Sequence, residues 1–404
     1  MRIAAIGEVA TLNPKPSPLP VDDDLVVPFI PMAAVHEDGG APSPASRRLA
    51  DLKSGYTFFE KGDILLAKIT PCFENGKTAY LDSLPQAFGF GSTEFHVLRA
   101  GPEIDPRYLF HAVRSAHFRL AGMSSMTGSA GQQRVPGKFV AKYRIPLPSL
   151  AEQRRRASIL DSADCMRRKQ RERIGLFDGL LQSIFLETFG DPVRNEKGWV
   201  RAEAAAAIRL IEAGTSVSGA GQPSLGEWGV LKISAVTSGW YLPGEAKAVT
   251  ALPDRPIFPK RGDLLFSRAN TRELVAATCL ADRDEDRLFL PDKLWRITVN
   301  TEVATAEYLR FLFADSGFRQ VLTQQATGNS GSMLNVSQDK VLRVHLPLPP
   351  IDLQRQFADI VWKIIGLRHR ALSARAKSEE LLEALAEHAF GRQAETNNDR
   401  PNVF

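Results

Sequence analysis

Cysteine, histidine and long apolar segments are all scarce in this sequence of 404 residues. The three cysteines, Cys72, Cys165 and Cys279, are far apart and form no CxxC pair, which argues against a zinc site and indicates a reducing compartment. The seven histidines have no metal-ligand spacing. No window of about 18 apolar residues occurs, and the first residues lack the apolar core of a signal peptide. We therefore expect a cytoplasmic protein with no membrane association.

Motifs for catalysis are also missing. Residues 73–78 end like a phosphate-binding Walker A loop, but Pro71 stands where that motif needs its first glycine. A metal-dependent nuclease needs a Glu-x-Lys after its Pro-Asp pair, and none follows Pro253-Asp254 or Pro291-Asp292 at a workable distance. The acidic run 282–286 could bind a cation, although a solvated turn is the better interpretation. We expect no catalytic residue, no bound metal and no bound cofactor in this chain.

The overall composition is that of a globular protein with a mild excess of basic residues. Hydrophobic residues make up 44% and charged residues 24%, which are ordinary proportions. The net charge of +5 and the isoelectric point of about 9.1 permit a polyanionic partner without demonstrating one. The length allows two or three domains with substantial cores.

The strongest positive feature is an internal repeat with an offset of about 200 residues. It comprises Gly62-Asp63-Ile64-Leu65 with Gly262-Asp263-Leu264-Leu265, Tyr108-Leu109 with Tyr308-Leu309, Phe118-Arg119 with Phe318-Arg319, Thr127-Gly128 with Thr327-Gly328, and Gln153-Arg154 with Gln354-Arg355. Little else between these anchors matches. The repeat predicts two domains that share a skeleton but differ in surface, and therefore in ligand.

The middle of the chain contains the signals of one long helix. Ser149 and Glu152 have the spacing of a capping box, so a helix should begin there. Gly190 can adopt the left-handed conformation of a helix C-terminus, and Pro192 lacks the N–H that a further turn needs, so the helix should end near Phe189. Such a helix of about 38 residues would be about 57 Å long. We interpret it as a spacer.

The same plan returns at residues 346–392, and both helices have an apolar seam with the spacing of a coiled coil. The predicted seams are Ile159, Ala163, Met166, Phe177, Leu180 and Ile184 in the first helix, and Phe357, Ile360, Ile364, Leu367, Ala371, Ala374, Leu381 and Leu385 in the second. The simpler alternative is that each helix packs on its own domain. Because the helix is duplicated, we expect the two helices to pair antiparallel and to hold the domains apart.

The rest of each repeat predicts short strands followed by a helix, which makes the fold class α+β. Residues 64–69, 79–81 and 94–98 have strand patterns, and residues 105–120 have helical spacing. The second copy repeats this order, with strands at 263–269 and 294–299 and a helix at 305–322.

Polar side chains that suit DNA gather after the predicted strands and in two glycine-rich stretches. Arg and Lys can read guanine edges, Asn and Gln can read adenine, and all of them can hold phosphates. The candidates are Lys68, Asn75, Lys77, Gln132, Gln133, Arg134 and Lys138 in the first copy, and Arg268, Asn270, Arg272, Lys293, Asn329, Ser332 and Asn335 in the second. For each residue alone, a solvated loop side chain remains the alternative. The basic run between Arg154 and Arg173 is equally consistent with a DNA-tracking stripe and with a solvated helix face.

Five segments of the chain resemble the specificity subunit of a type I restriction-modification enzyme. They are KITPCFENGK at 68–77, TGSAGQQRVP at 127–136, GDLLFSRANTRELV at 262–275, and the Pro-Leu-Pro…Gln-Arg helix starts at 146–154 and 347–355. The resemblance implies two target recognition domains that each read one half of an asymmetric bipartite site in double-stranded DNA, separated by two antiparallel helices. The expected division is 1–148 and 191–348 for the recognition domains, 149–190 and 349–391 for the spacer helices, and 392–404 for a polar tail.

The resemblance also implies partners that perform the chemistry. Two modification (methyltransferase) subunits and the restriction/translocase subunits would bind S-adenosylmethionine, ATP and Mg²⁺, while this chain would bind no cofactor. Two alternatives from other classes remain open. One is a non-enzymatic scaffold whose two domains bind proteins, and the other is a stand-alone nuclease or methyltransferase with an unrecognised site.

Overall fold

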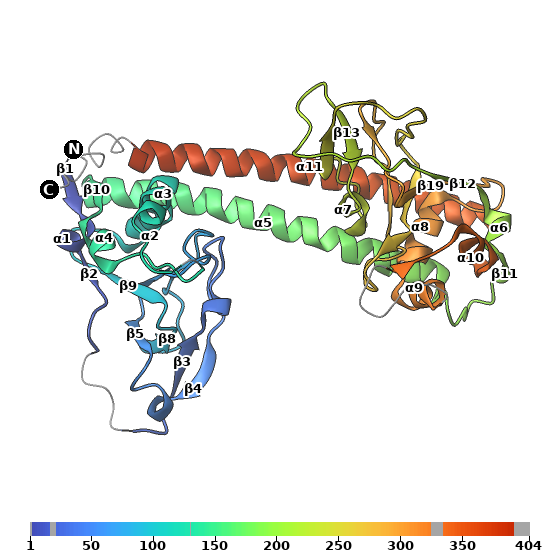
Figure 1. Cartoon of the computed structure of the whole chain (residues 1–404). Helices are drawn as coiled ribbons and strands as arrows, with labels where there is room; N and C mark the ends of the chain where they lie inside the picture. Colours follow the sequence, from blue (N-terminus) through green and yellow to red (C-terminus); the bar gives the residue numbers. More distant parts are fainter. Residues whose placement is uncertain (1, 17–21, 130, 325–333, 392–404) are drawn as a thin grey trace. The chain divides into compact units, whose positions relative to one another are not determined.

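The computed structural model describes residues 2–16, 22–129, 131–324 and 334–391. The chain forms two compact units (Figure 1). Unit 1 comprises Met1–Arg173 and Ala371–Phe404, and unit 2 comprises Ile174–Arg370. Both borders between the units fall inside long helices, so each unit contains part of each long helix.

Unit 1 contains two four-stranded sheets. The first has the order β2 (Ala10–Leu12), β9 (Phe95–Ala100), β6 (Ile64–Ala67), β7 (Thr78–Tyr80), and the second has the order β4 (Ala45–Arg48), β3 (Val26–Ile30), β8 (Phe88–Gly91), β5 (Thr57–Glu60). All neighbours are antiparallel except β3 and β8. Strand β6 is buried along its whole length, which explains its uninterrupted apolar sequence. The expected strands of this copy are confirmed.

Further short strands and helices complete unit 1. They are β1 (Arg2–Ala5), which pairs with β10 (Arg144–Leu147), the helices α1 (Ile6–Val9), α2 (Pro106–Arg114), α3 (Ala116–Ser124) and α4 (Gly137–Lys142), and the short 3₁₀ helices η1 (Met32–Ala34) and η2 (Leu49–Asp51). The expected single helix at 105–120 is wrong, because the extended backbone of Ser115 separates α2 from α3. The Ser115 hydroxyl accepts a hydrogen bond from the Phe118 N–H and so caps α3.

Unit 2 repeats this architecture. Its first sheet has the order β12 (Ile208–Ala213), β19 (Leu294–Val299), β15 (Leu264–Ser267), β17 (Thr278–Leu280). Its second sheet has the order β14 (Ala246–Val249), β13 (Trp228–Leu231), β18 (Leu288–Phe289). Two pairs of strands complete the unit, β11 (Val200–Glu203) with β21 (His345–Leu348) and β16 (Ala269–Asn270) with β20 (Leu334–Asn335). Its helices are α6 (Ala204–Ala207), α7 (Ser234–Thr237), α8 (Ala306–Ala314), α9 (Ser316–Thr323) and α10 (Gln338–Arg343). Strands β13 and β18 are parallel, as β3 and β8 are. The helix expected at 305–322 is also divided, at Asp315, whose carboxylate caps α9.

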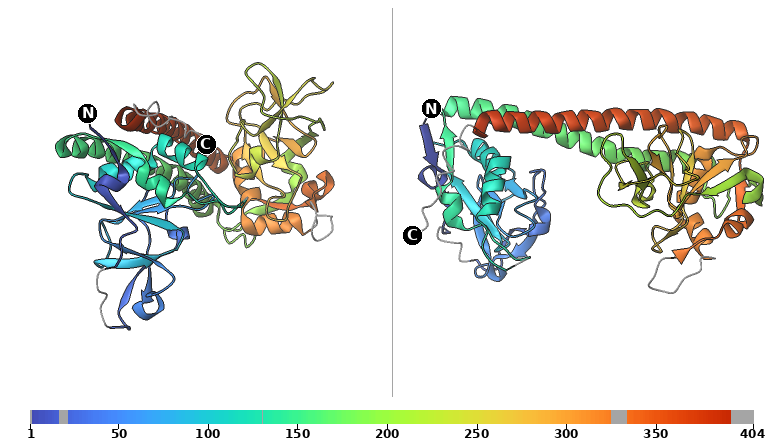
Figure 2. Two further views of the ribbon diagram at one scale, coloured as in Figure 1. Left: turned by 60° about the vertical axis from the view of Figure 1, so that its left-hand side comes forward. Right: turned by 45° about the horizontal axis from the view of Figure 1, so that its top comes forward.

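The two long helices are α5 (Leu150–Phe189) and α11 (Ile351–Phe390), each of 40 residues (Figure 2). The predicted ends of α5 are confirmed. The Ser149 hydroxyl accepts a hydrogen bond from the Glu152 N–H at 3.4 Å, and Gly190 has a φ of +78° directly after the last helical residue. At a rise of about 1.5 Å per residue, each helix is about 60 Å long.

The helices pair antiparallel, because the beginning of each packs near the end of the other. In unit 1, Phe390 at the end of α11 belongs to the same core cluster as Ala157 and Leu160 near the start of α5. In unit 2, the Phe189 ring of α5 lies 5.3 Å from the Phe357 ring of α11. The same helices also pack on their units, since Phe390 and Phe189 contact Tyr108 and Tyr308. The long helices therefore pair with each other and also pack on the folded units, so both expectations from the sequence hold.

The predicted seams are wrong in part. Ile159, Met166 and Leu180 are 39%, 54% and 47% exposed, and Ile360 and Leu381 are 36% and 48% exposed. The positions one residue later are buried instead, at Leu160, Leu181 and Val361. A coiled-coil seam faces one neighbouring helix. These helices are covered by a partner helix and by a folded unit together, so the buried face of each includes residues outside the predicted seam.

A buried glutamine explains why the Gln-Arg pair recurs at both helix starts. The Gln153 side chain is fully buried; its oxygen accepts from the Asp105 N–H at 2.8 Å, and its amide donates to the carbonyls of Glu103 at 3.1 Å and Pro148 at 2.9 Å. Gln354 makes the same three bonds, with Thr305, Val303 and Pro349. Each glutamine therefore joins the start of a long helix to the turn that precedes α2 in unit 1 or α8 in unit 2.

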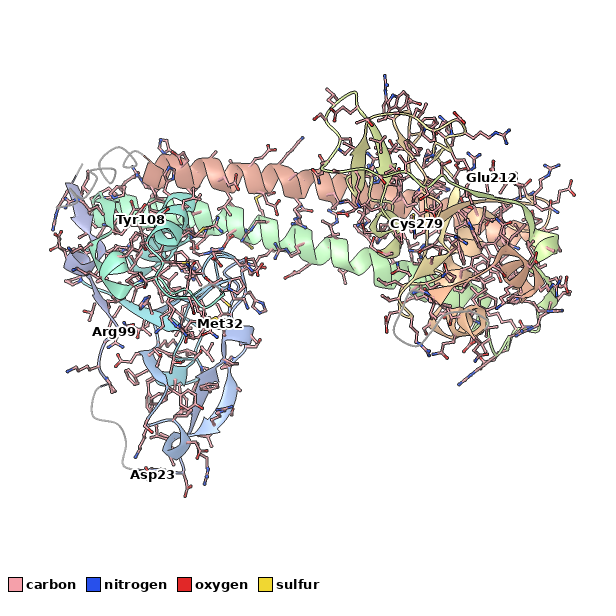
Figure 3. All side chains as sticks on the ribbon, viewed as in Figure 1. Asp23, Met32, Arg99, Tyr108, Glu212 and Cys279 are labelled. Carbon is pink, nitrogen blue, oxygen red and sulfur yellow. The ribbon has the colours of Figure 1, made fainter. Side chains whose placement is uncertain are left out.

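A tyrosine makes a second repeated link. Tyr108, labelled in Figure 3, donates its hydroxyl to the Pro146 carbonyl at 3.0 Å, and Tyr308 donates to the Pro347 carbonyl at 2.6 Å. Burial raises the pKa of Tyr108 to about 12. The repeated Tyr-Leu and Pro-Leu-Pro motifs are therefore two ends of one contact.

Candidate nucleic-acid interface

Two candidate residues of unit 1, Lys68 and Arg134, lie close together at the end of β6, where backbone hydrogen bonds join their segments. The Lys68 N–H donates to the Glu94 carbonyl at 2.9 Å, and the Lys68 carbonyl accepts from the Val135 N–H at 2.8 Å. Lys68 therefore lies between the segment that enters β9 and the segment that contains Arg134. Three stretches that are distant in the sequence meet at one place.

Unit 2 reproduces this junction. The Arg268 N–H donates to the Lys293 carbonyl at 3.1 Å, and the Arg268 carbonyl accepts from the Val336 N–H at 2.9 Å. Asn335 pairs with Ala269 where β20 meets β16. Arg268, Lys293 and Asn335 thus occupy the places that Lys68, Glu94 and Arg134 occupy in unit 1.

The side chains at these equivalent places differ in charge. In unit 1 the Arg134 guanidinium donates to both carboxylate oxygens of Glu94, at 2.9 and 2.8 Å. The hydrogen bonds from Arg134, with a smaller contribution from the Lys68 charge, lower the pKa of Glu94 below its usual value. In unit 2 a lysine replaces the glutamate and an asparagine replaces the arginine. In the first junction the acidic partner is Glu94, which binds Arg134, whereas in the second it is Asp292, which contacts both Lys293 and Arg268.

The other candidates of unit 1 divide into engaged and exposed side chains. The Lys77 ammonium donates to the Met32 carbonyl at 3.3 Å, which places it against η1 (Figure 3 labels Met32). The Asn75 amide donates to the Glu37 carboxylate at 2.9 Å. Gln132 and Lys138 are exposed, the latter on α4, and Gln133 is half-buried. Gln132 and Lys138 are therefore the side chains most open to a ligand in this set.

In unit 2 the half-buried Arg268 donates its Nε to the Asp292 carbonyl at 3.1 Å, and the Lys293 ammonium lies 3.5 Å from the Asp292 carboxylate. The Asn270 side chain accepts from the Thr271 N–H at 2.8 Å. Asn335 is exposed. Asn329 and Ser332 lie outside the residues that the structure describes.

Arg272 is exposed at the rim of a cavity of about 650 Å³. Arg319, Gln320 and Gln324 also line this cavity. The Arg319 guanidinium donates to the Glu273 carbonyl at 3.2 Å, and burial lowers its pKa. Our sequence reasoning missed Arg319 as a functional candidate, although the repeated Phe-Arg pair at 118–119 and 318–319 was a usable signal. Glu94 was missed because nothing in its local sequence indicated its arginine partner.

The acidic run 282–286 and the basic run on α5 are largely satisfied within their own units. The Asp282 carboxylate accepts from the His369 ring at 2.7 Å and from Arg283 at 2.9 Å, which favours the structural interpretation of the acidic turn. Arg155 and Arg156 both donate to Glu152. Within the described ranges, no group of three His, Cys, Asp or Glu side chains could hold a metal ion.

The chemistry of both junctions is that of a binding surface. Cationic and amide side chains converge on loops at the ends of rigid strands, where they can hold phosphates and donate to base edges. No helix in the described part of the chain is sufficiently long and apolar to span a bilayer.

Comparison with known proteins points in one direction. Residues 2–174 match the family model described as the type I restriction modification DNA specificity domain. The specificity subunit of the type I restriction enzyme EcoEI of Escherichia coli is 28% identical, in an alignment that covers 95% of this chain and 82% of that protein. The EcoAI specificity subunit of Escherichia coli is 43% identical over 152 residues, which cover 37% of this chain and 26% of that protein.

Two solved structures have a similar fold. The specificity subunit of a type I restriction-modification system from M. genitalium superimposes with a TM-score of 0.58 at 13% identity, covering 96% of both chains. A chain from a structure concerned with complex assembly and conformational transition of the type I restriction-modification system gives a TM-score of 0.53 at 19% identity, covering 96% of this chain and 97% of that one. At these identities the likeness concerns the fold alone.

Proposed function

Because this chain belongs to the family of type I restriction-modification specificity subunits, we propose that its two units each read one half of an asymmetric bipartite site in double-stranded DNA. The chain is the DNA specificity subunit of such a system and is itself non-catalytic. The observation that carries the bipartite proposal is the duplicated junction at the ends of β6 and β15. One frame is built twice, and it presents different side chains in each copy.

The division of labour follows the chain. We propose that residues 1–148 and 191–348 are the recognition domains, that 149–190 and 349–391 are the spacer helices, and that 392–404 is a tail. The proposed contacts in the first domain are Lys68, Asn75, Lys77, Gln132, Gln133, Arg134 and Lys138. Those in the second are Arg268, Asn270, Arg272, Lys293, Asn329, Ser332 and Asn335. The exposed Gln132, Lys138 and Arg272 need no rearrangement to reach DNA, whereas Arg134 would first have to leave Glu94.

We propose that two modification subunits bind at the long helices, and that restriction/translocase subunits join through them. Leu176 on α5 is 71% exposed and Leu186 is 40% exposed. Apolar side chains that neither the partner helix nor the unit covers suit a further protein surface. S-adenosylmethionine, ATP and Mg²⁺ would then be bound by these partners, and the site on this chain would take DNA alone.

Separate reading of the two half-sites is tested by substitution followed by sequencing of methylated bases in a host that carries all subunits. Arg272→Ala should relax base choice in one half-site, at a cost of about 1–3 kcal/mol if its contact is bidentate. Lys68→Ala should affect the other half-site. The matched control is Arg355→Ala, which removes an exposed arginine of α11. One substitution that relaxed both half-sites equally would contradict the model of two readers.

The two competing classes predict different behaviour. If the chain binds DNA phosphates, the logarithm of its affinity for DNA falls linearly with the logarithm of the salt concentration. A protein-interaction scaffold would show no such salt-dependent binding of DNA. The purified chain alone, supplied with S-adenosylmethionine, ATP and Mg²⁺, should neither methylate nor cut DNA. Activity of the isolated chain would favour the stand-alone enzyme.

A further inference from the structure

The two units are attached to the starts of their long helices at equivalent positions but through different chemistry. Helix α11 follows α5 with an offset of 201 residues, since Gln354 takes the place of Gln153, and α8 follows α2 with an offset of 200. These offsets relate the contact between α2 and α5 in unit 1 to the contact between α8 and α11 in unit 2. The side chains in the two contacts can therefore be compared position by position.

In unit 1 this contact is a buried polar network around two aspartates of α5. The Asp164 carboxylate is 3% exposed and accepts from Arg114 at 2.8 Å, Arg167 at 2.6 Å and Arg168 at 3.0 Å. One turn earlier, Asp161 accepts from the His111 ring at 2.9 Å and from Arg107 at 3.2 Å. A single carboxylate thus gathers three guanidinium groups from two helices.

In unit 2 the equivalent contact is largely apolar. Ile365 stands in the place of Asp164 and is 7% exposed. Trp362 replaces Asp161 and donates its indole N–H to Glu307 at 2.5 Å, and Phe311 replaces His111. The guanidinium of Arg368, the counterpart of Arg167, stacks over the Trp240 ring at 4.1 Å. The same attachment has therefore been built once from ion pairs and once mainly from rings and aliphatic groups.

The polar network of unit 1 extends to the loop at residues 36–40. Arg171 of α5 donates to the Asp38 carboxylate at 3.1 Å, and Arg167 donates to the Asp38 backbone carbonyl at 2.9 Å. The other Asp38 oxygen accepts from the Gly40 N–H at 3.0 Å and shapes the turn. Gly39 has a φ of +72°, and a Cβ atom there would lie 2.4 Å from Cζ of Arg114, so the loop lies directly against the network.

The loop at residues 36–40 also contacts residues 68–77, the candidate DNA-binding loop of unit 1. Glu37, next to Asp38, accepts from the Asn75 amide at 2.9 Å. Gly76 packs its backbone against Arg119 and the Glu37 carbonyl. A continuous series of contacts therefore leads from Asn75 through Glu37 and Asp38 to Arg171 on the spacer helix.

We infer that the Asp38–Arg171 ion pair, backed by the Asp164 network, is a positioning device that fixes the DNA-binding loop 68–77 of unit 1 in register with spacer helix α5. Asp38 and Arg171 are positioning residues that act through Glu37 and Asn75. This inference rests on the proposed reading of a bipartite site. A reader held at a defined angle to the helix accepts only one gap between half-sites, because one additional unread pair moves a half-site by about 3.4 Å and turns it by about 34°.

The physical basis of the inference is that ion pairs between arginine and a carboxylate depend strongly on the orientation of the two groups. Ion pairs contribute little net stability in either setting, because desolvation offsets the attraction at the buried Asp164 and solvent screening weakens the half-exposed Asp38–Arg171 pair. They have strict geometry, however, since a guanidinium binds a carboxylate in few orientations. Unit 1 retains the polar version where unit 2 shows that an apolar version folds, which is consistent with a role in orientation rather than in stability.

The test uses the full chain co-expressed with its modification subunits, and duplex DNA that contains the native half-sites with gaps one pair shorter, equal or one pair longer. Methylation rates are measured for wild type, Arg171→Ala, Asp38→Ala and the double variant. We expect each single substitution to lower the ratio of the methylation rate at the native gap to the rate at the other gaps by about two- to fivefold, since Arg171 is half-exposed and solvent screens its ion pair. The double variant should show no further loss, because both changes remove the same contact.

Two further variants separate orientation from other roles. Arg171→Lys keeps the charge beside Asp38 and should retain most of the gap preference, while Arg173→Ala, two residues along the same helix and exposed, should behave as wild type. Base preference within each half-site should be unchanged in all variants. Thermal unfolding followed by circular dichroism shows which variants remain folded.

Three results would overturn the inference. They are an unchanged gap preference in a folded Arg171→Ala protein, a uniform loss of methylation at all gaps in that protein, and additive effects in the double variant. A uniform loss would identify Arg171 as a phosphate contact. If the wild-type complex methylates no bipartite DNA at all, the proposed function fails, and that result is distinguishable because it appears before any variant is compared.

Discussion

Replacing Gln153 by methionine should destabilise unit 1 and leave unit 2 unchanged. Methionine has nearly the same length and volume but forms none of the three hydrogen bonds of the amide. The Asp105 N–H and the carbonyls of Glu103 and Pro148 would lose their partner in a fully buried position. Each unsatisfied buried group costs about 1–3 kcal/mol, and partial relaxation of the turn leads us to expect a total of about 3–5 kcal/mol.

Tryptophan fluorescence distinguishes the two units, because unit 1 has no tryptophan. All five tryptophans belong to unit 2, at Trp199, Trp228, Trp240, Trp295 and Trp362. In urea, far-ultraviolet circular dichroism follows both units and fluorescence follows unit 2 alone. With an m value of about 2 kcal/mol per molar, the expected destabilisation lowers the unit 1 midpoint by about 1.5–2.5 M in the dichroism signal.

The matched variant is Gln354→Met, which removes the equivalent bonds to Thr305, Val303 and Pro349 and should shift the fluorescence transition instead. Gln356→Met, at an exposed position two residues further along α11, should change the free energy of unfolding by less than about 0.5 kcal/mol. If Gln153→Met shifted both signals equally, the long helices would couple the units into one cooperative transition. A shift below about 1 kcal/mol would show that the buried amide is not a principal link.

Two further predictions concern the stability of the long helix and its dependence on pH. Gly175→Ala and Gly179→Ala should each stabilise α5 by about 1 kcal/mol, because nothing lies within 4 Å of a Cβ placed at either position, and urea titration measures the gain. Lowering the pH from about 7 to about 5 should destabilise unit 1, since burial depresses the pKa of both His96 and His111. The unfolded chain then binds more protons than the folded one below the ordinary histidine pKa, so the dichroism midpoint should fall in this window; a midpoint that rose would contradict the assignment.

The repeat and the helix ends were readable from the sequence because they depend on local chemistry. A capping serine, a glycine able to adopt a positive φ and a proline each act within one turn of backbone, so the ends of α5 followed directly. The same applies to β6 and β15, whose short apolar runs directly after a Gly-Asp turn predicted buried strands. Identical anchors at a constant offset require that both copies build the same frame, whatever surrounds them.

The divided helices and the buried faces of α5 and α11 could not be obtained in this way. Ser115 is compatible with a helix interior as well as with a cap; in the structure its backbone is extended, and α2 and α3 both contribute side chains to one core cluster. The exposure of Ile159 and Met166 and the burial of Leu160 depend on a folded unit that covers part of each helix. A heptad pattern contains no information about such a second neighbour.

The sequence by itself determined that this chain is a duplicated α+β protein with two long helices and polar loops suited to DNA, because periodicity, caps and repeats are properties of neighbouring residues. Only the tertiary structure decided which of those polar side chains are open and which are engaged. The Arg134–Glu94 pair and the Asp38–Arg171 pair join residues 40 and 133 positions apart, and the distance between two charges depends on the folding of all the chain that separates them.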